Sequence, residues 1–219
     1  MRLADSLRAG NGFRCRSCKV ALCLAARVAL NGLRPLPIMK PMTTIRRARA
    51  ADAPLILEFV RELAEYEREP QSARLTEAEL VRDGFPANGE TPFFECLIAE
   101  EDGEPAGFAL FFPVYSTWRG RAMHLEDLFV RPRFRGRGIG KSLLTHVAAR
   151  SVERGCVLLF WHVLDWNQPA IDFYHSLGAG MLTEWRRMRV ADDALTALAR
   201  EAQTNAEAPA SQPAAEGRA

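Results

Sequence analysis

EDLFVRPRFRGRGIGKS, residues 126–142, is the stretch that decides the fold. An apolar strand pattern stops at Arg131 and Pro132, and a turn containing Gly136, Gly138 and Gly140 then opens directly into a helical pattern. Several backbone N–H groups converge at such a helix start, which is also the positive end of the helix dipole. The stretch therefore predicts a turn that binds a phosphate group.

Two common phosphate-binding motifs resemble this stretch, but each requires a glycine that the stretch lacks. A Walker A loop needs a glycine at the position that Arg135 occupies, five residues before Gly-Lys-Ser. A dinucleotide fingerprint starting at Gly136 needs its third glycine at Lys141, but that glycine comes one residue early, at Gly140. The sequence therefore predicts neither ATP hydrolysis nor NAD binding.

Around the glycine turn, segments with the two-residue hydrophobic period of a strand alternate with segments that have the helical period. Strand patterns lie at residues 43–49, 93–100, 105–115, 121–130, 157–163 and 181–190, and the second and third are joined by a turn at 101–104. Helix patterns begin after Asp52, at Thr76 with a capping box, at Ile139 with a stripe that includes Val152, and after Asn167. This order predicts one mixed α/β domain over residues 42–192.

Charge is distributed unevenly along the 219-residue chain. The formal net charge is +2, but residues 1–41 carry +7, which leaves −5 for residues 42–219. A mildly acidic body argues against a nucleic-acid partner and is compatible with a cationic substrate.

The two ends of the chain are expected to lie outside the domain. Residues 1–41 are basic and partly apolar, as in a transit or signal peptide, and the favoured interpretation is an extension from a misplaced start. The apolar run at 20–33 is too short to span a bilayer. Residues 193–219 are expected to hold a helix end and a tail that is disordered from about Gln203.

Cysteine usage predicts a reducing compartment and no metal. The pair Cys15 and Cys18 has no second ligand pair, so a zinc site is not expected. Cys96 and Cys156 lie in apolar runs and are expected to be buried free thiols, which is typical of a cytoplasmic protein.

Residues 135–140, RGRGIG, resemble the R/Q-x-x-G-x-G/A acetyl-CoA signature of the GNAT superfamily of acetyltransferases. Residues 167–178 resemble that family's N-x-x-A-x-x-F-Y segment. Residues 62–67, 75–77, 83–85, 125–130 and 184–186 are similar to diamine (spermidine/spermine) acetyltransferases, and the similarity covers about residues 44–190. The resemblance implies a single-domain GNAT fold, a mixed and mostly antiparallel sheet flanked by helices, and a homodimer.

The resemblance also implies which residues act. Glu126 would be the base that takes the amine proton, and Tyr174 the acid that protonates the coenzyme A thiolate. Acetyl-CoA contacts are expected from Leu128, Phe129, Val130, Arg135, Gly136, Arg137, Gly138, Ile139, Gly140, Lys141, Asn167 and Tyr174. Acceptor contacts are expected from Tyr66, Glu67, Glu126 and Trp161.

Each assignment has a structural alternative. Glu126 could be a solvated or salt-bridged strand carboxylate, Tyr174 a core aromatic, and Glu67 part of a solvated helix end. In a regular strand Asp127 would face away from Glu126. His124, His146, His162 and His175 are assigned to structural or surface positions.

The function that this pattern favours is acetyl transfer from acetyl-CoA to a primary amine of a small cationic acceptor, a diamine, polyamine or lysine analogue. The alternatives are a coenzyme A-binding sensor without transfer and a protein-lysine acetyltransferase. Residues 160–162 are bulkier than the matching segment of the animal diamine enzymes, so the acceptor need not be spermidine.

Overall fold

The computed structural model describes residues 41–207, which form two compact units, one ending at His162 and the other beginning at Val163. The predictions made for the basic leader, with Cys15 and Cys18, and for residues 208–219 lie outside the described residues.

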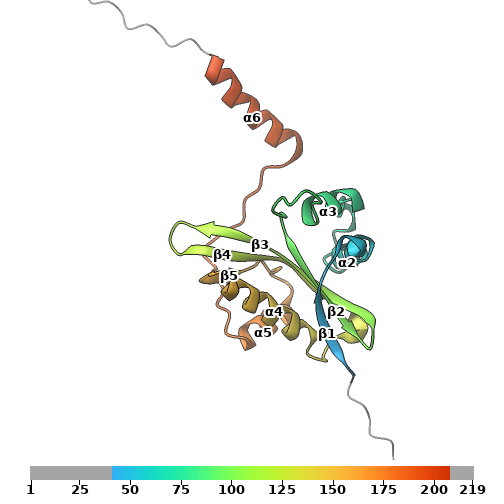
Figure 1. Cartoon of the computed structure of the whole chain (residues 1–219). Helices are drawn as coiled ribbons and strands as arrows, with labels where there is room; N and C mark the ends of the chain where they lie inside the picture. The colour runs from blue at the N-terminus through green and yellow to red at the C-terminus, as the bar shows by residue number, and fades with distance from the viewer. Residues whose placement is uncertain (1–40, 208–219) are drawn as a thin grey trace, which may run out of the picture. The chain divides into compact units, whose positions relative to one another are not determined.

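The first unit is built on a five-stranded sheet in the order β1-β2-β3-β4-β5 (Figure 1). The strands are β1 (Thr43–Arg47), β2 (Glu95–Glu101), β3 (Glu104–Ser116), β4 (Gly120–Val130) and β5 (Leu158–Phe160). The first three pairings are antiparallel and β4 pairs with β5 in parallel. The prediction of a mixed, mostly antiparallel sheet is confirmed.

The predicted turn between β2 and β3 is a two-residue hairpin. Asp102 and Gly103 both have positive φ, 51° and 82°, which is the backbone of a type I′ turn. Such a turn matches the twist of the strands it joins, and it fixes Glu101 opposite Glu104.

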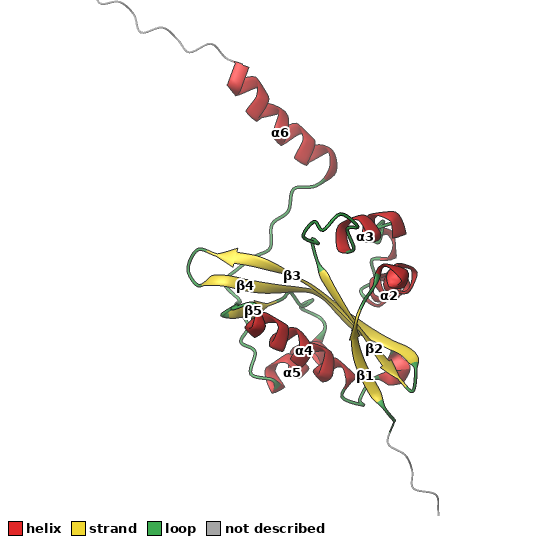
Figure 2. Ribbon diagram, in the orientation of Figure 1, coloured by secondary structure: helices red, strands yellow, loops and turns green. Residues whose placement is uncertain are grey.

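Helices cover both faces of this sheet (Figure 2). Helices α2 (Ala53–Tyr66) and α3 (Glu77–Gly84) lie on one face, and α4 (Ile139–Glu153) lies on the other. Short 3-10 turns η1 (Ala50–Asp52), η2 (Pro70–Ser72) and η3 (Pro132–Phe134) connect the elements.

The α2 face holds an aromatic core. Phe59 of α2 stacks on Phe108 of β3 with ring centroids 5.3 Å apart, and Phe129 of β4 packs beside them. Burying one such aromatic side chain stabilises a fold by about 1.5–3 kcal/mol. On the opposite face α4 buries Ile139, Leu143 and Val147, as its apolar stripe predicts. Val152, assigned to that stripe, is instead exposed, because at about 3.6 residues per turn it lies on the opposite side of α4 from Leu143, while Ser151 beside it is buried.

Of the helix caps predicted at Thr76 and Asp52, the structure contains only the one at Thr76. Thr76 forms the predicted capping box, since its Oγ1 accepts from the Glu79 amide at 3.3 Å and its own amide donates to Glu79 at 2.9 Å. Asp52 precedes α2 but makes no side-chain cap. Its carboxylate instead pairs with Arg46 at 2.8 Å, and this pairing holds the pKa of Asp52 below its usual value.

The second unit contains α5 (Gln168–Ser176) and α6 (Asp192–Glu207). The strand predicted at residues 181–190 is wrong: these residues are exposed and irregular, because in the described second unit no strand stands beside them to complete a ladder. The disordered tail expected from Gln203 is also wrong as far as Glu207, where α6 ends. None of the helices between residues 41 and 207 is both long and apolar enough to cross a bilayer.

Candidate active site

The glycine turn has the backbone of an anion-binding helix start. Gly136 and Gly138 adopt left-handed φ values of 74° and 87°, which residues with a Cβ rarely adopt, and Gly138 is the N-cap of α4. The Ser142 amide makes the first ladder bond, to the Gly138 carbonyl at 2.9 Å. The amides of Ile139, Gly140 and Lys141 precede that bond and have no acceptor within the helix ladder, so they can receive a phosphate.

Two arginine side chains brace this turn. Arg135 donates from Nε to the Val130 carbonyl at 2.8 Å, and its guanidinium lies 4.8 Å from the centroid of the Tyr66 ring. Arg137 forms an ion pair with the buried Glu101 and donates to the Arg133 carbonyl at 2.9 Å. The structure thus brings Tyr66, predicted to bind the acceptor, beside Arg135, predicted to bind the cofactor.

Strands β4 and β5 separate next to the turn. They pair only from Ala122 opposite Leu158 to His124 opposite Phe160. From Leu125 to Val130 this edge of β4 has no neighbouring strand in the described residues. Alternate residues of β4 turn their N–H and C=O groups toward this open edge, where an extended ligand with amide groups can pair with them, as in strand addition, although the Val130 carbonyl already accepts from Arg135.

A β-bulge places Glu126. On β3 the register advances from Leu110 to Phe111, while on β4 it steps from Asp127 to Leu125, so Glu126 is the extra residue. The prediction that Asp127 faces away from Glu126 assumed a regular strand and is wrong. Asp127 pairs with Leu110, which packs in the α2-face core. Glu126 contacts His124, whose paired residue Phe112 packs against the same core.

Three carboxylates therefore form an acidic cluster, defined by Glu67, Glu126 and Asp127. Burial, with added repulsion from Glu126 and Glu67, raises the pKa of Asp127 to about 7. Burial and the Glu126 charge also raise the pKa of Glu67. Gathering like charges in a half-buried place is unfavourable unless a cation joins them, so the cluster is suited to an ammonium group.

His124 is the site residue that the sequence reasoning missed. It was assigned to a structural or surface position, but its side chain is only 8% exposed and its Nε2 lies 3.0 Å from Glu126 Oε2. A signal was present in the sequence: residues two apart on a strand share a face, so a histidine two positions before the predicted base could have been expected beside it.

The second unit carries Asn167 and Tyr174. Asn167 caps α5 as predicted, accepting from the Ala170 amide at 3.4 Å. The helix closes in a Schellman motif, in which Ala179 donates to the Tyr174 carbonyl at 3.1 Å and Gly178 has φ 86°. Tyr174 is half-buried, with its ring 5.2 Å from that of Phe173. The half-buried Trp161 lies at the end of the first unit, just beyond β5.

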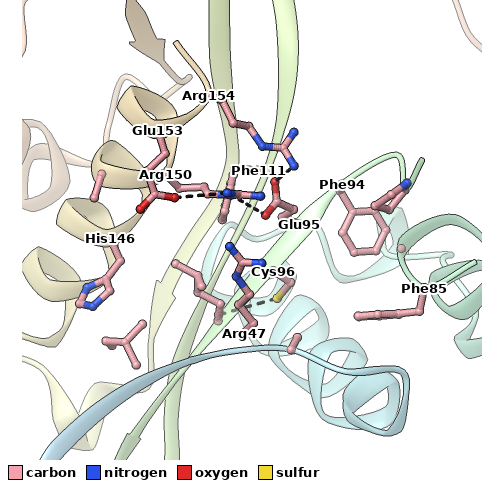
Figure 3. Close-up of a pocket in the computed structure, with 16 residues that line it drawn as sticks. Arg47, Phe85, Phe94, Glu95, Cys96, Phe111, His146, Arg150, Glu153 and Arg154 are labelled. Atoms are coloured by element: carbon pink, nitrogen blue, oxygen red, sulfur yellow. Dashed lines mark hydrogen bonds and ion pairs between the residues drawn. The ribbon is translucent and has the colours of Figure 1, made fainter. Parts of the chain in front are cut away.

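A cavity of about 500 Å³ lies in the first unit, between the C-terminal half of α4 and strands β1 and β2 (Figure 3). Inside it Glu95 accepts from Arg150 Nε at 2.9 Å and also pairs with Arg154, while Arg47 projects from β1. None of the predicted site residues lines this cavity. The candidate chemistry is therefore at the bulge of β4 and the start of α4.

Comparison with known proteins identifies the family. A model of the Acetyltransferase (GNAT) family matches residues 56–179, which is more than half of the chain and includes parts of both units. The chain belongs to the GNAT acetyltransferase family. The glycine turn, the bulge of β4 and the Asn167 helix all lie inside the matched region.

Several acetyltransferases match large parts of this GNAT acetyltransferase. Thialysine N-epsilon-acetyltransferase of Sus scrofa is 43% identical over an alignment of 166 residues, and the match covers 71% of this chain and 96% of the relative. The Caenorhabditis elegans protein of the same name is 36% identical over 67% of this chain and 90% of its own length. Spermidine/spermine N(1)-acetyltransferase-like protein 1 of Homo sapiens is 37% identical over 62% of this chain and 20% of its own length.

Solved structures agree on the fold. An integron cassette protein from the V. cholerae mobile metagenome superposes with a TM-score of 0.59 at 25% identity, covering 72% of this chain and 98% of its own. An aminoglycoside N-acetyltransferase in complex with CoA gives a TM-score of 0.56 at 20% identity, covering 74% and 99%. The predicted single-domain GNAT fold is confirmed.

Proposed function

We propose that this acetyltransferase moves the acetyl group of acetyl-CoA to a primary amine of a small cationic acceptor, a diamine, polyamine or lysine analogue such as thialysine. The acidic cluster of Glu67, Glu126 and Asp127 is the observation that carries the proposal. The names of the relatives, thialysine and spermidine/spermine acetyltransferases, support the same class of acceptor.

Acetyl-CoA fits the residues at the start of α4. The amides of Ile139, Gly140 and Lys141 and the left-handed Gly136 and Gly138 would hold its pyrophosphate, with the exposed Lys141 adding a positive charge. The open edge of β4, from Leu128 to Val130, would hold the amide-bearing pantetheine arm. Arg135 and Arg137 would act here chiefly by fixing the turn, because their guanidinium groups already bind protein atoms. Asn167 would add a contact from the cap of α5.

The acceptor would enter beside α2. Tyr66 and Glu67 lie at the end of that helix, and a second ammonium group of the acceptor would be placed between Glu67 and Asp127. Trp161, just beyond β5, would supply an aromatic face for the alkyl chain or the cation.

The chemistry then needs one base and one acid. An alkyl ammonium has a pKa near 10.4, so the acceptor amine must lose a proton before it can attack. Glu126 takes that proton, directly or through a water molecule, and the neutral amine attacks the thioester carbonyl. The carbon–sulfur bond breaks as the amide forms, and the Tyr174 hydroxyl protonates the departing thiolate.

An acceptor panel tests the proposal. Thiol release would be measured with acetyl-CoA and spermidine, putrescine, thialysine, lysine, an aminoglycoside and a lysine-containing peptide. Turnover is expected with a small diamine or lysine analogue and not with the peptide. Acetyl-CoA binding without turnover on any member of the panel would favour a sensor, and turnover on the peptide alone would favour a protein-lysine acetyltransferase.

Two variants separate binding from chemistry. Tyr174→Phe and Glu126→Gln are each expected to lower kcat by about 10²- to 10⁴-fold, the usual contribution of an acid or base, while acetyl-CoA affinity measured by calorimetry stays unchanged. Phe173→Leu, next to Tyr174, is the matched control and should leave kcat within a few fold. Full activity in both Tyr174→Phe and Glu126→Gln would overturn the assigned residues.

We also propose a homodimer, as the resemblance to diamine acetyltransferases implies, and a cytoplasmic location, which the free thiols of Cys96 and Cys156 support. Light scattering on the purified protein at micromolar concentration would give twice the chain mass. A mass of 24.4 kDa, that of one chain, would contradict this part of the proposal.

A further inference from the structure

His124 is buried in an aromatic surround on β4. Its ring centroid lies 5.1 Å from that of Phe112 and 4.8 Å from that of Phe160, with the His162 ring at 5.3 Å. One ring nitrogen, Nε2, meets Glu126 Oε2 at 3.0 Å. The other, Nδ1, is buried and has no hydrogen-bond partner among residues 41–207.

This environment decides which nitrogen carries the proton. An ionised Glu126 can only accept, so Nε2 must be the donor. A proton on Nδ1 would create a buried N–H without an acceptor, which is costly. The tautomer with its proton on Nε2 avoids this cost, since only a lone pair of Nδ1 is then left without a partner.

We propose that His124 is a positioning residue that holds the carboxylate of Glu126 in one orientation through the Nε2–H donor. This inference rests on the proposed function, in which Glu126 is the base. The rigid ring cannot move far, because it is wedged between Phe112 and Phe160. One oxygen of Glu126 is held by His124, so the other is left to take the proton of the acceptor amine.

The bulge makes such a restraint necessary. Glu126 is the extra residue of β4, without a directly paired residue on β3, and its side chain is 41% exposed. A glutamate with that freedom populates several rotamers, and only some would aim at the amine. Asp127 and Glu67 also repel it, so without a donor the carboxylate would turn toward solvent.

Two substitutions test this. His124→Phe keeps an aromatic ring in the surround but removes the donor, while His124→Gln places an amide N–H where Nε2 lies. Removing one donor to a charged group corresponds to about a ten- to hundredfold loss, expected in kcat. His124→Gln should recover most of this loss. Acetyl-CoA KM and the thermal midpoint should be alike in the two variants, so a packing defect would not produce the difference.

A double-mutant cycle separates this inference from the proposed function. If His124 acts through Glu126, His124→Phe should cause no further loss in a Glu126→Gln background. Equal losses in both backgrounds, or a His124→Gln variant as slow as His124→Phe, would overturn the positioning role. Full activity in Glu126→Gln itself would instead overturn the choice of Glu126 as base.

Discussion

Arg137 of the glycine turn forms an ion pair with Glu101, the last residue of β2, whose side chain is only 3% exposed. The guanidinium also lies 5.6 Å from the Phe134 ring and donates to the Arg133 carbonyl. A buried carboxylate of this kind needs a fixed cation beside it. The turn that would receive the pyrophosphate is therefore tied to the central sheet, 36 residues away in sequence.

Glu101→Gln should loosen this turn. Because Arg137 is half exposed and the new side-chain amide could still accept a hydrogen bond, we expect a loss of about 1–2 kcal/mol in the free energy of unfolding. Acetyl-CoA KM should rise about three- to tenfold with kcat nearly unchanged, since the turn holds ground and transition states alike. The control is Glu104→Gln, which breaks an exposed pair with Arg133 and should change both quantities little. An equal effect of the two variants would contradict this account.

Gly138→Ala tests the backbone of the same turn. A methyl group there meets no atom within 4 Å, so any effect comes from the φ of 87°, which costs an alanine about 1–2 kcal/mol. The strain should move the first amides of α4 and raise the dissociation constant for acetyl-CoA about tenfold in calorimetry. Gly180→Ala is the matched control, because that glycine also has open space around it and no left-handed φ. Unchanged affinity in Gly138→Ala would show that the turn does not bind through this geometry.

Local signals predicted most of this fold. The β2–β3 turn depends on Asp102 and Gly103, the capping box on Thr76 and Glu79, and the α5 cap on Asn167. Each of these residues acts on its own neighbours in sequence, so the sequence alone predicts these features. The glycine turn was also a local pattern. The predicted order of elements is confirmed up to α5 for the same reason.

Features that depend on pairing could not be predicted. The bulge at Glu126 exists because β3 and β4 slip by one residue, and neither strand alone encodes that slip. The bulge decides that Asp127 shares a face with Glu126. The buried ring of His124 likewise follows from Phe112 and Phe160, which belong to other strands. Residues 181–190 alternate like a strand, but alternation does not supply a neighbouring edge.

Arg131 joins α2 to the end of β4, and its removal should be costly. The guanidinium donates to Glu62 at 2.7 Å, to Glu58 at 2.6 Å and to the Pro105 carbonyl at 3.1 Å, and it lies 4.6 Å from the Phe59 ring centroid. With only 12% of the side chain exposed, Arg131→Ala should lower the free energy of unfolding by about 2–4 kcal/mol.

Chemical denaturation measures this loss. Arg131→Lys should recover part of the stability, because it keeps the charge but not the planar fork. The control is Arg61→Ala, because Arg61 is an exposed arginine of α2, the helix that Arg131 contacts. Its free energy of unfolding should stay within about 0.5 kcal/mol of that of the parent protein. If Arg131→Ala is no more destabilised than that control, the contact between α2 and β4 does not depend on this side chain.

Asp127 should make the stability of the protein depend on pH. Its pKa is raised to about 7 by burial and by Glu126 and Glu67, from an ordinary value of 3.8. Between these two values the folded protein binds the proton more than the unfolded chain does, so the free energy of unfolding falls as the pH rises from about 4 to 7. Asp127→Asn removes this pH dependence. The variant's free energy of unfolding should exceed that of the parent by about 1–3 kcal/mol at pH 8 and nearly equal it at pH 4.

Denaturation curves at pH 4, 6 and 8 test the sign, with the exposed Asp165→Asn as the control. The same proton links stability to the acceptor. A diamine that binds the ionised cluster must displace the Asp127 proton, so its KM should fall as the pH rises from 6 to 8, and Asp127→Asn should weaken that dependence and raise KM at pH 8. If Asp127→Asn is no more stable than the parent at pH 8 and binds the diamine equally well, Asp127 is not part of the acidic cluster that receives the acceptor.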